Sequence, residues 1–104
     1  MKILIADDHD LLRDTLVLFV EGEGSIEIVT ASDLDEALAI VDAQGPFDLI
    51  MLDYNMPGMS GLDGLKRALT YNGDQKVALM SGIAKRSVAE EALALGAAGF
   101  VPKT

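Results

Sequence analysis

Short apolar segments alternate with longer amphipathic segments along the whole chain. Most of the short segments are apolar throughout, as strands buried on both faces of a parallel sheet are. The second one alternates apolar and polar residues, which predicts a half-exposed or edge strand. The fifth is followed by Pro102, and proline is tolerated at a sheet edge rather than at its centre. The predicted strands are Ile3–Ala6, Ile26–Ala31, Leu49–Leu52, Val77–Met80 and Gly99–Val101.

The segments between the strands carry apolar residues at the 3.6-residue spacing of an amphipathic helix. Leu12, Leu16 and Phe19 show this spacing in the first of them. We predict four helices, over residues 10–21, 33–44, 62–72 and 88–95. Strands that alternate with helices in this way predict an α/β fold with one parallel sheet and right-handed crossovers.

Residues that favour helix ends flank these segments. Ser32 is the expected N-cap of the second helix, and Ser87-Val-Ala-Glu90 has the pattern of a capping box that opens the fourth. Gly96 is the expected residue after the last turn of that helix. A single aspartate outside a strand end usually caps a helix or forms a turn, and this role is assigned to Asp10, Asp33 and Asp74.

Polar residues follow four of the five predicted strands. The carboxyl ends of parallel strands lie at one edge of the sheet, where ligands bind in open α/β folds. The residues expected to converge there are Asp7, Asp8, Asp53, Ser81 and Lys103. Each of these alone is more simply explained as a capping or surface residue. Their placement together on one side of one sheet favours a functional site.

Three carboxylates in one place repel each other, so one or more would hold a proton unless a cation lies between them. Mg²⁺ prefers carboxylate, carbonyl and water oxygens, so a magnesium site is expected at this edge. A carboxylate beside Mg²⁺ and the Lys103 ammonium is a suitable phosphoryl acceptor, because phosphoryl transfer is catalysed mainly by positioning and charge neutralisation. The Ser81 hydroxyl can then donate a hydrogen bond to a phosphoryl oxygen.

The acidic composition of the chain restricts its partners. The 104 residues carry 8 basic and 17 acidic side chains, for a formal charge of −9, which argues against a nucleic-acid or anionic-membrane surface. The absence of cysteine excludes disulfides and thiolate sites. The apolar runs are too short to cross a bilayer or to form a signal peptide. We therefore expect one soluble cytoplasmic domain.

Five stretches of the sequence together resemble the receiver domain of two-component response regulators. They are Ile3-Leu-Ile-Ala-Asp-Asp8, Leu49-Ile-Met-Leu-Asp53, Asn55-Met-Pro-Gly-Met-Ser-Gly61, Leu79-Met-Ser81 and Gly96-Ala-Ala-Gly-Phe-Val-Pro-Lys103. The first and the last are most similar to receivers of NarL/LuxR-type transcription regulators. The resemblance implies a three-layer, flavodoxin-like fold with the strands in the order 2-1-3-4-5.

The resemblance also implies a role for each matching residue. Asp53 is the expected phosphoacceptor for a sensor histidine kinase. Asp8, Asp53 and the backbone carbonyl of Asn55 are the expected ligands of Mg²⁺, for which Mn²⁺ could substitute, and Asp7 would hold the ion mainly through water. Lys103 and Ser81 would contact the phosphoryl group.

Phe100 is the expected aromatic switch residue. The surface formed by the fourth helix and the fifth strand would change on phosphorylation. It would thereby control a transcription-regulator output domain outside this chain, so the chain itself is expected to act as a phosphoacceptor switch rather than as an enzyme acting on other substrates.

Three other functions compete with this prediction. A metal-dependent phosphatase or phosphotransferase also uses an aspartate nucleophile after a parallel strand, but such enzymes need a second aspartate where this chain has Asn55. A flavin-binding electron carrier would place the flavin phosphate against the acidic strand ends. A degenerate receiver that only binds partners would not need the acids, Ser81 and Lys103.

The length of the chain leads to one further expectation. Receivers have five helices, and residues 1–104 end just after the fifth predicted strand, so the resemblance implies an incomplete receiver domain without its last helix and without an effector domain. Such a helix would average about 11–12 residues. We expect self-association, either through the surface of the fourth helix and fifth strand or through the sheet face that the last helix would cover.

Overall fold

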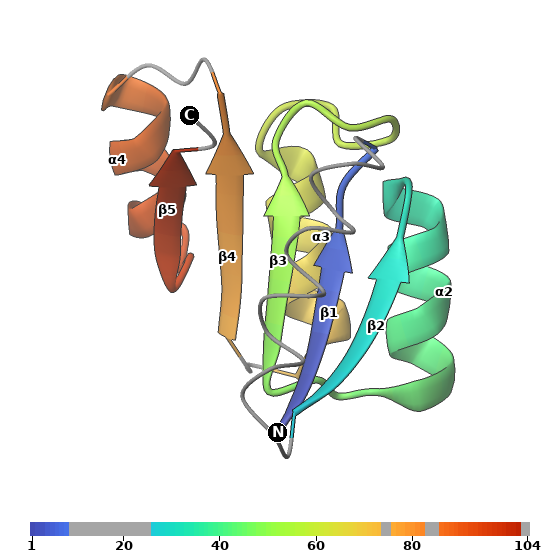
Figure 1. Ribbon diagram of the computed structural model, residues 1–104. Coiled ribbons are helices and arrows are strands. Elements are labelled where there is room, and N and C mark those ends of the chain that lie inside the picture. Colours follow the sequence, from blue (N-terminus) through green and yellow to red (C-terminus); the bar gives the residue numbers. More distant parts are fainter. Residues whose placement is uncertain (9–25, 74–75, 83–85, 103–104) are drawn as a thin grey trace.

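The computed structural model describes residues 1–8, 26–73, 76–82 and 86–102 of the chain. Five parallel strands form one sheet in the order β2-β1-β3-β4-β5 (Figure 1). They are β1 (Lys2–Ala6), β2 (Glu27–Ala31), β3 (Leu49–Asp53), β4 (Lys76–Ser81) and β5 (Gly99–Pro102). The predicted α/β class, the strand order and all five strand positions are therefore confirmed, with boundaries that differ by one residue.

The described helices are α2 (Leu34–Gln44), α3 (Asp63–Tyr71) and α4 (Arg86–Ala94). They follow β2, β3 and β4, as the alternating pattern predicts. In Figure 1, α3 lies behind the sheet and α2 lies beside β2, and the two helices contact each other. The helix predicted over residues 10–21 lies outside the described residues. Within the described part of the chain, no helix has the length and apolar character that a bilayer span requires.

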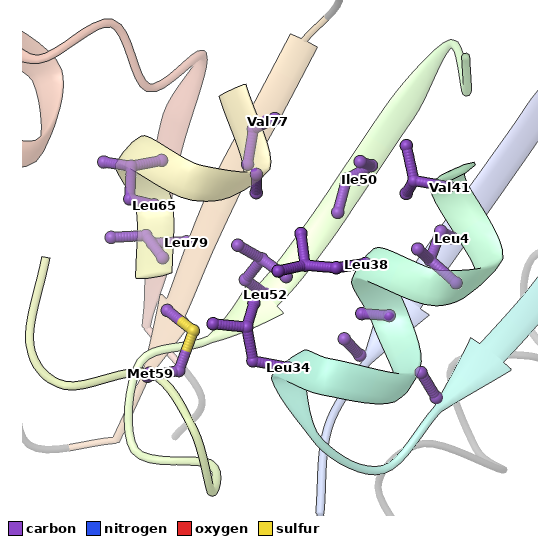
Figure 2. Close-up of a cluster of buried hydrophobic side chains, with 14 of the residues drawn as sticks. Leu4, Leu34, Leu38, Val41, Ile50, Leu52, Met59, Leu65, Val77 and Leu79 are labelled. Atoms are coloured by element: carbon purple, nitrogen blue, oxygen red, sulfur yellow. The ribbon is translucent and has the colours of Figure 1, made fainter. Parts of the chain in front are cut away.

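The main hydrophobic core lies between the sheet and the three helices. Leu34, Leu38 and Val41 of α2 pack against Leu4 and Ile50 of the sheet (Figure 2). Alternate residues of the same strands point to the opposite face, where a smaller cluster contains Ile3, Ile5 and Met80. Since both faces of the central strands are buried, these strands are apolar throughout, as the sequence pattern indicates.

The edge strands differ from the central ones in the predicted way. Among the described strands, β2 pairs with β1 alone, and three of its five residues are half-buried. At the other edge, β5 pairs with β4 alone among these strands, with Pro102 opposite Ser81. A proline there removes no hydrogen bond from the interior of the sheet.

Two of the predicted helix starts are wrong, that of α2 by one residue and that of α4 by two. Asp33, not Ser32, is the N-cap of α2, because its Oδ1 accepts a hydrogen bond from the backbone N–H of Glu36 at 2.7 Å. The Glu36 carboxylate accepts from the backbone N–H of Ser32 at 2.8 Å, so Ser32 precedes the cap. Helix α4 begins at Arg86, which places Ser87 inside the helix rather than at its cap.

The predicted end of α4 at Gly96 is confirmed. Gly96 has a φ of +112°, and its N–H donates to the Leu93 carbonyl at 3.1 Å. The N–H of Ala97 donates to the Ala92 carbonyl at 3.0 Å. This pair of bonds is the Schellman arrangement, in which a left-handed residue closes the helix.

Candidate functional site

Two strand ends place the acidic residues at one edge of the sheet. Asp53 is the last residue of β3, and Asp7 and Asp8 directly follow β1, its neighbour. The backbone N–H of Asp7 donates to the Ala31 carbonyl at 3.0 Å, so the pairing between β1 and β2 continues to this residue. The main chain that carries the carboxylates is therefore held by the sheet itself.

The three predicted carboxylates lie close together. One oxygen of each of Asp7, Asp8 and Asp53 lies within 4.8 Å of the corresponding oxygen of the other two. Asp7 and Asp53 are fully buried, whereas Asp8 is exposed. The cluster thus has two acids inside the protein and one at the mouth of the site.

This donor set fits a hard divalent cation. Three carboxylates offer oxygen ligands and a high negative charge, and the exposed side at Asp8 leaves space for the water ligands that Mg²⁺ keeps. Softer metals prefer cysteine and histidine ligands, and the described cluster contains neither. Asp7, Asp8 and Asp53 are the described residues whose carboxylates lie close enough together to hold such an ion.

Ser81 joins the site from the adjacent strand. It is the last residue of β4, which pairs with β3, and only 2% of its surface is exposed. The Asn55 side chain donates a hydrogen bond from Nδ2 to Ser81 Oγ at 3.4 Å, and the Asn55 backbone N–H donates to Asp53 Oδ1 at 3.1 Å. Asn55 therefore connects the central carboxylate with the hydroxyl.

The contact between Asn55 and Ser81 was not predicted, because the sequence suggests only the backbone carbonyl of Asn55 as a participant. The contact between Asn55 and Ser81 follows from the pairing of β3 with β4. Asp53 lies opposite Met80 in the register, so the residues that follow these two positions emerge side by side. An asparagine two residues beyond Asp53 can then contact a serine one residue beyond Met80.

The loop after Asp53 is fixed to the hydrophobic core. The side chains of Met56 and Met59 are buried, and the Pro57 carbonyl accepts a hydrogen bond from the backbone N–H of Leu34 at 3.0 Å. Gly58 has a φ of +91°, and a Cβ there would lie 3.1 Å from Leu34 Cβ. This close approach connects the loop that carries Asn55 to the first turn of α2.

Two predicted participants remain to be placed. Phe100 lies on β5, half-buried, with its side chain packed against the main core. Lys103 lies outside the described residues. The structure thus brings together Asp7, Asp8, Asp53, Asn55 and Ser81, and puts Phe100 on the strand next to the one that ends at Ser81.

Comparison with known proteins agrees with this arrangement. The family model described as "Response regulator receiver domain" matches residues 3–104. The chain is 38% identical over 104 residues to the glycerol metabolism activator of Pseudomonas putida, an alignment that covers 99% of this chain and 47% of the relative. The chain therefore spans about half the length of the curated relatives it matches.

Solved structures show the same fold. The signal receiver domain of NarL from Mycobacterium tuberculosis matches with a TM-score of 0.86 and 34% identity, over 98% of this chain and 82% of that one. CheY of Borrelia burgdorferi, solved in a complex with CheX, BeF3 and Mg²⁺, gives a TM-score of 0.90 at 28% identity, over 100% and 78%. From the matched family model, the strand order and the carboxylate edge together, the chain belongs to the response regulator receiver domain family.

Proposed function

We propose that this chain is a phosphorylation switch in which Asp53 accepts a phosphoryl group from a sensor histidine kinase. The observation that carries the proposal is the position of Asp53, buried at the end of β3 within 4.8 Å of two further carboxylates. Its Oδ1 already accepts the N–H of Asn55, which orients the carboxylate before any donor arrives. Positioning of this kind is a main source of catalysis in phosphoryl transfer.

In the proposed step, a carboxylate oxygen of Asp53 attacks the phosphorus of phosphohistidine. An O–P bond forms as the P–N bond breaks, and the imidazole keeps the electron pair of the broken bond. Asp8, Asp53 and the Asn55 carbonyl, with Asp7 acting through water, would hold Mg²⁺, which would supply charge neutralisation on the phosphoryl oxygens. Lys103 adds a second positive charge, and Mn²⁺ is expected to replace Mg²⁺.

The readout is proposed to begin at Ser81. A hydroxyl that leaves Asn55 for a phosphoryl oxygen changes the end of β4, and Phe100 on the neighbouring strand turns into the space released. The surface of α4 and β5 would then differ between two states, as in other switches where a local charge biases a packing equilibrium. We propose two consequences of this change, both in the cytoplasm. The surface controls a transcription-regulator output domain, and it also supports self-association.

The decisive experiment uses the purified chain with Mg²⁺ and acetyl phosphate, followed by intact-mass spectrometry. The wild type should gain one phosphoryl group, and the Asp53→Asn variant should gain none. Asp63→Asn serves as the matched control, because Asp63 is an exposed aspartate in the first turn of α3, outside the carboxylate cluster. A wild type that gains no mass contradicts the proposal, and so does an equal loss of phosphorylation in the two variants.

A second measurement separates the switch from the competing phosphatase. An aspartate-dependent phosphatase hydrolyses general phosphomonoesters in many turnovers, whereas a phosphoacceptor reacts once with an activated donor. Incubation with p-nitrophenyl phosphate and Mg²⁺ should release no nitrophenol above the rate of the Asp53→Asn variant. Sustained turnover that depends on Asp53 would overturn the proposed function.

A further inference from the structure

A groove lies between α2 and α3 on the outer side of the helical layer, and it shares no residue with the carboxylate site. Its volume is about 240 Å³, and Leu38 of the core forms its buried floor. All but one of the lining residues are exposed. They are Asp35, Leu38, Ala39, Asp42, Arg67 and Tyr71.

The two walls of the groove carry opposite charges. The α2 wall presents the carboxylates of Asp35 and Asp42, and the α3 wall presents the guanidinium of Arg67. Within the described part of the chain, the structure records no ion pair or hydrogen bond for these three side chains. Both halves of a possible ion pair are therefore present on one surface without being used inside the chain.

The small volume of the groove and the opposite charges of its walls restrict the kinds of molecule that can bind there. Small-molecule sites usually enclose about 300–1,000 Å³, which is more than the groove offers. A purely basic segment would meet Arg67, and a purely acidic one would meet two carboxylates. An occupant that carries both signs would be complementary to both walls.

A second copy of this chain meets that requirement. A two-fold axis places residue i of one copy against residue j of the other and repeats the same contact in reverse. Arg67 of each copy would then face Asp35 and Asp42 of the other, so one axis supplies two sets of opposite charges. Tyr71, which is 48% exposed at the rim, offers the kind of aromatic side chain that is enriched in interfaces.

We propose that the α2–α3 groove is a docking surface for a second copy of this chain, related by a two-fold axis and independent of phosphorylation. The surface is small, and the chain carries a net charge of −9, so the dimer is weak and transient. We expect the dimer to form at protein concentrations on the order of 0.1–1 mM. The salt concentration should be about 0.15 M, because charge repulsion between the copies is then screened beyond about 8 Å.

Sedimentation equilibrium on charge-reversed variants tests this pairing. Arg67→Asp alone should weaken dimerisation by at least about tenfold, because it places like charges opposite each other. Asp35→Lys/Asp42→Lys should do the same. A mixture of the two variants should dimerise again, since the introduced aspartate of one chain type would face the introduced lysines of the other while the unaltered residues pair as before.

The matched control is Lys66→Asp, the same kind of charge reversal one residue away on α3, at an exposed position that does not line the groove. It should leave the dimer constant within about twofold. Leu93→Ser on α4 and Asp53→Asn should also leave it unchanged, which separates this contact from association through the proposed switch surface. All substituted positions other than Asp53 are exposed, and circular dichroism verifies that each variant keeps its fold.

Three results would overturn the proposal. The first is a wild type that remains monomeric at 1 mM. The second is an equal loss of dimer in Arg67→Asp and Lys66→Asp, which would indicate net charge rather than a specific contact. The third is a mixture of the two complementary variants that stays monomeric. None of these results bears on phosphorylation of Asp53, so the proposed function would stand or fall separately.

Discussion

Helices α2 and α4 are attached to the same sheet in very different ways. Helix α2 buries Leu34, Ala37, Leu38 and Val41, whereas the only fully buried residue of α4 is Ala92. Leu93 of α4 is 51% exposed. A buried leucine contributes about 1.5–3 kcal/mol relative to an exposed one, and a buried alanine contributes far less. The α2 side is therefore fixed by its packing, and the α4 side is held by little apolar burial.

The carboxylate site lies between these two regions. The loop after Asp53 is anchored to the first turn of α2 through the bond between Pro57 and Leu34. Ser81 ends the strand that leads toward α4. Because weakly packed elements are the ones that open and rearrange, the switch proposed above would shift the α4 side at a smaller cost in free energy than the α2 side.

The largest effect is expected when one leucine is truncated in each of the two helices, α2 and α4. Leu34→Ala should lower the free energy of unfolding by about 2–5 kcal/mol, because it leaves a cavity in the main core. Leu93→Ala on α4 should change it by less than about 0.5 kcal/mol, as expected for an exposed position. Urea denaturation followed by circular dichroism measures both. Similar losses in the two variants would show that α4 is as firmly packed as α2.

A buried amide on the α3 side gives the next largest effect. Asn72 is fully buried, and its side chain accepts from the Phe47 N–H at 2.7 Å and donates to the Phe47 carbonyl at 3.0 Å. Asn72→Ala should cost about 2–3 kcal/mol of stability, because both backbone groups of Phe47 then lose their partner. Thr70→Ala, two residues earlier and exposed, is the control and should cost less than about 0.5 kcal/mol. Equal losses of stability in Asn72→Ala and Thr70→Ala would indicate a general effect at the end of α3 rather than loss of the hydrogen bonds to Phe47.

The N-cap of α2 gives a smaller effect and tests which residue caps the helix. Asp33→Ala should lower stability by about 1 kcal/mol, because the N–H of Glu36 loses its acceptor. Ser32→Ala should be within about 0.5 kcal/mol of the wild type, since its backbone N–H, rather than its hydroxyl, makes the short bond to Glu36. Thermal or urea unfolding of the two variants decides between them. A larger loss of stability in Ser32→Ala than in Asp33→Ala would show that Ser32 is the N-cap, as the sequence predicts.

The smallest expected effect is on the surface of α4. Arg86 and Glu90 form an ion pair one turn apart at 2.9 Å, with both side chains mostly exposed. Glu90→Gln should change stability by no more than about 0.5 kcal/mol. Hydrogen exchange of the α4 amides should become slightly faster at low salt and unchanged at 1 M NaCl, where the pair is screened. Glu91→Gln is the control, because this exposed carboxylate forms no ion pair with any residue in the part of the chain that the structure describes.

The sequence determined the architecture because its signals are local and repeated. The spacing of apolar residues separates strands from helices, and apolar strands such as Leu49–Leu52 have to be covered on both faces. Parallel strands end at one edge, so the acids after the first and third strands had to meet. The strand pattern alone therefore predicts Asp7, Asp8, Asp53 and Ser81 at one edge of the sheet, which is where they lie.

Only the tertiary structure decided the contacts between residues distant in the chain. Asn72 meets Phe47 across 25 residues, and Asn55 meets Ser81 across 26. In the sequence, Asn72 before Gly73 has the pattern of an ordinary helix end. An exposed asparagine forms its hydrogen bonds with water, so a specific protein partner becomes necessary only when the side chain is buried. The prediction of Ser32 rather than Asp33 as the cap of α2 was wrong for a similar reason, because both side chains can accept the same bond and the path of the chain selects one. Local patterns thus determine the fold, and burial and geometry determine which polar groups meet within it.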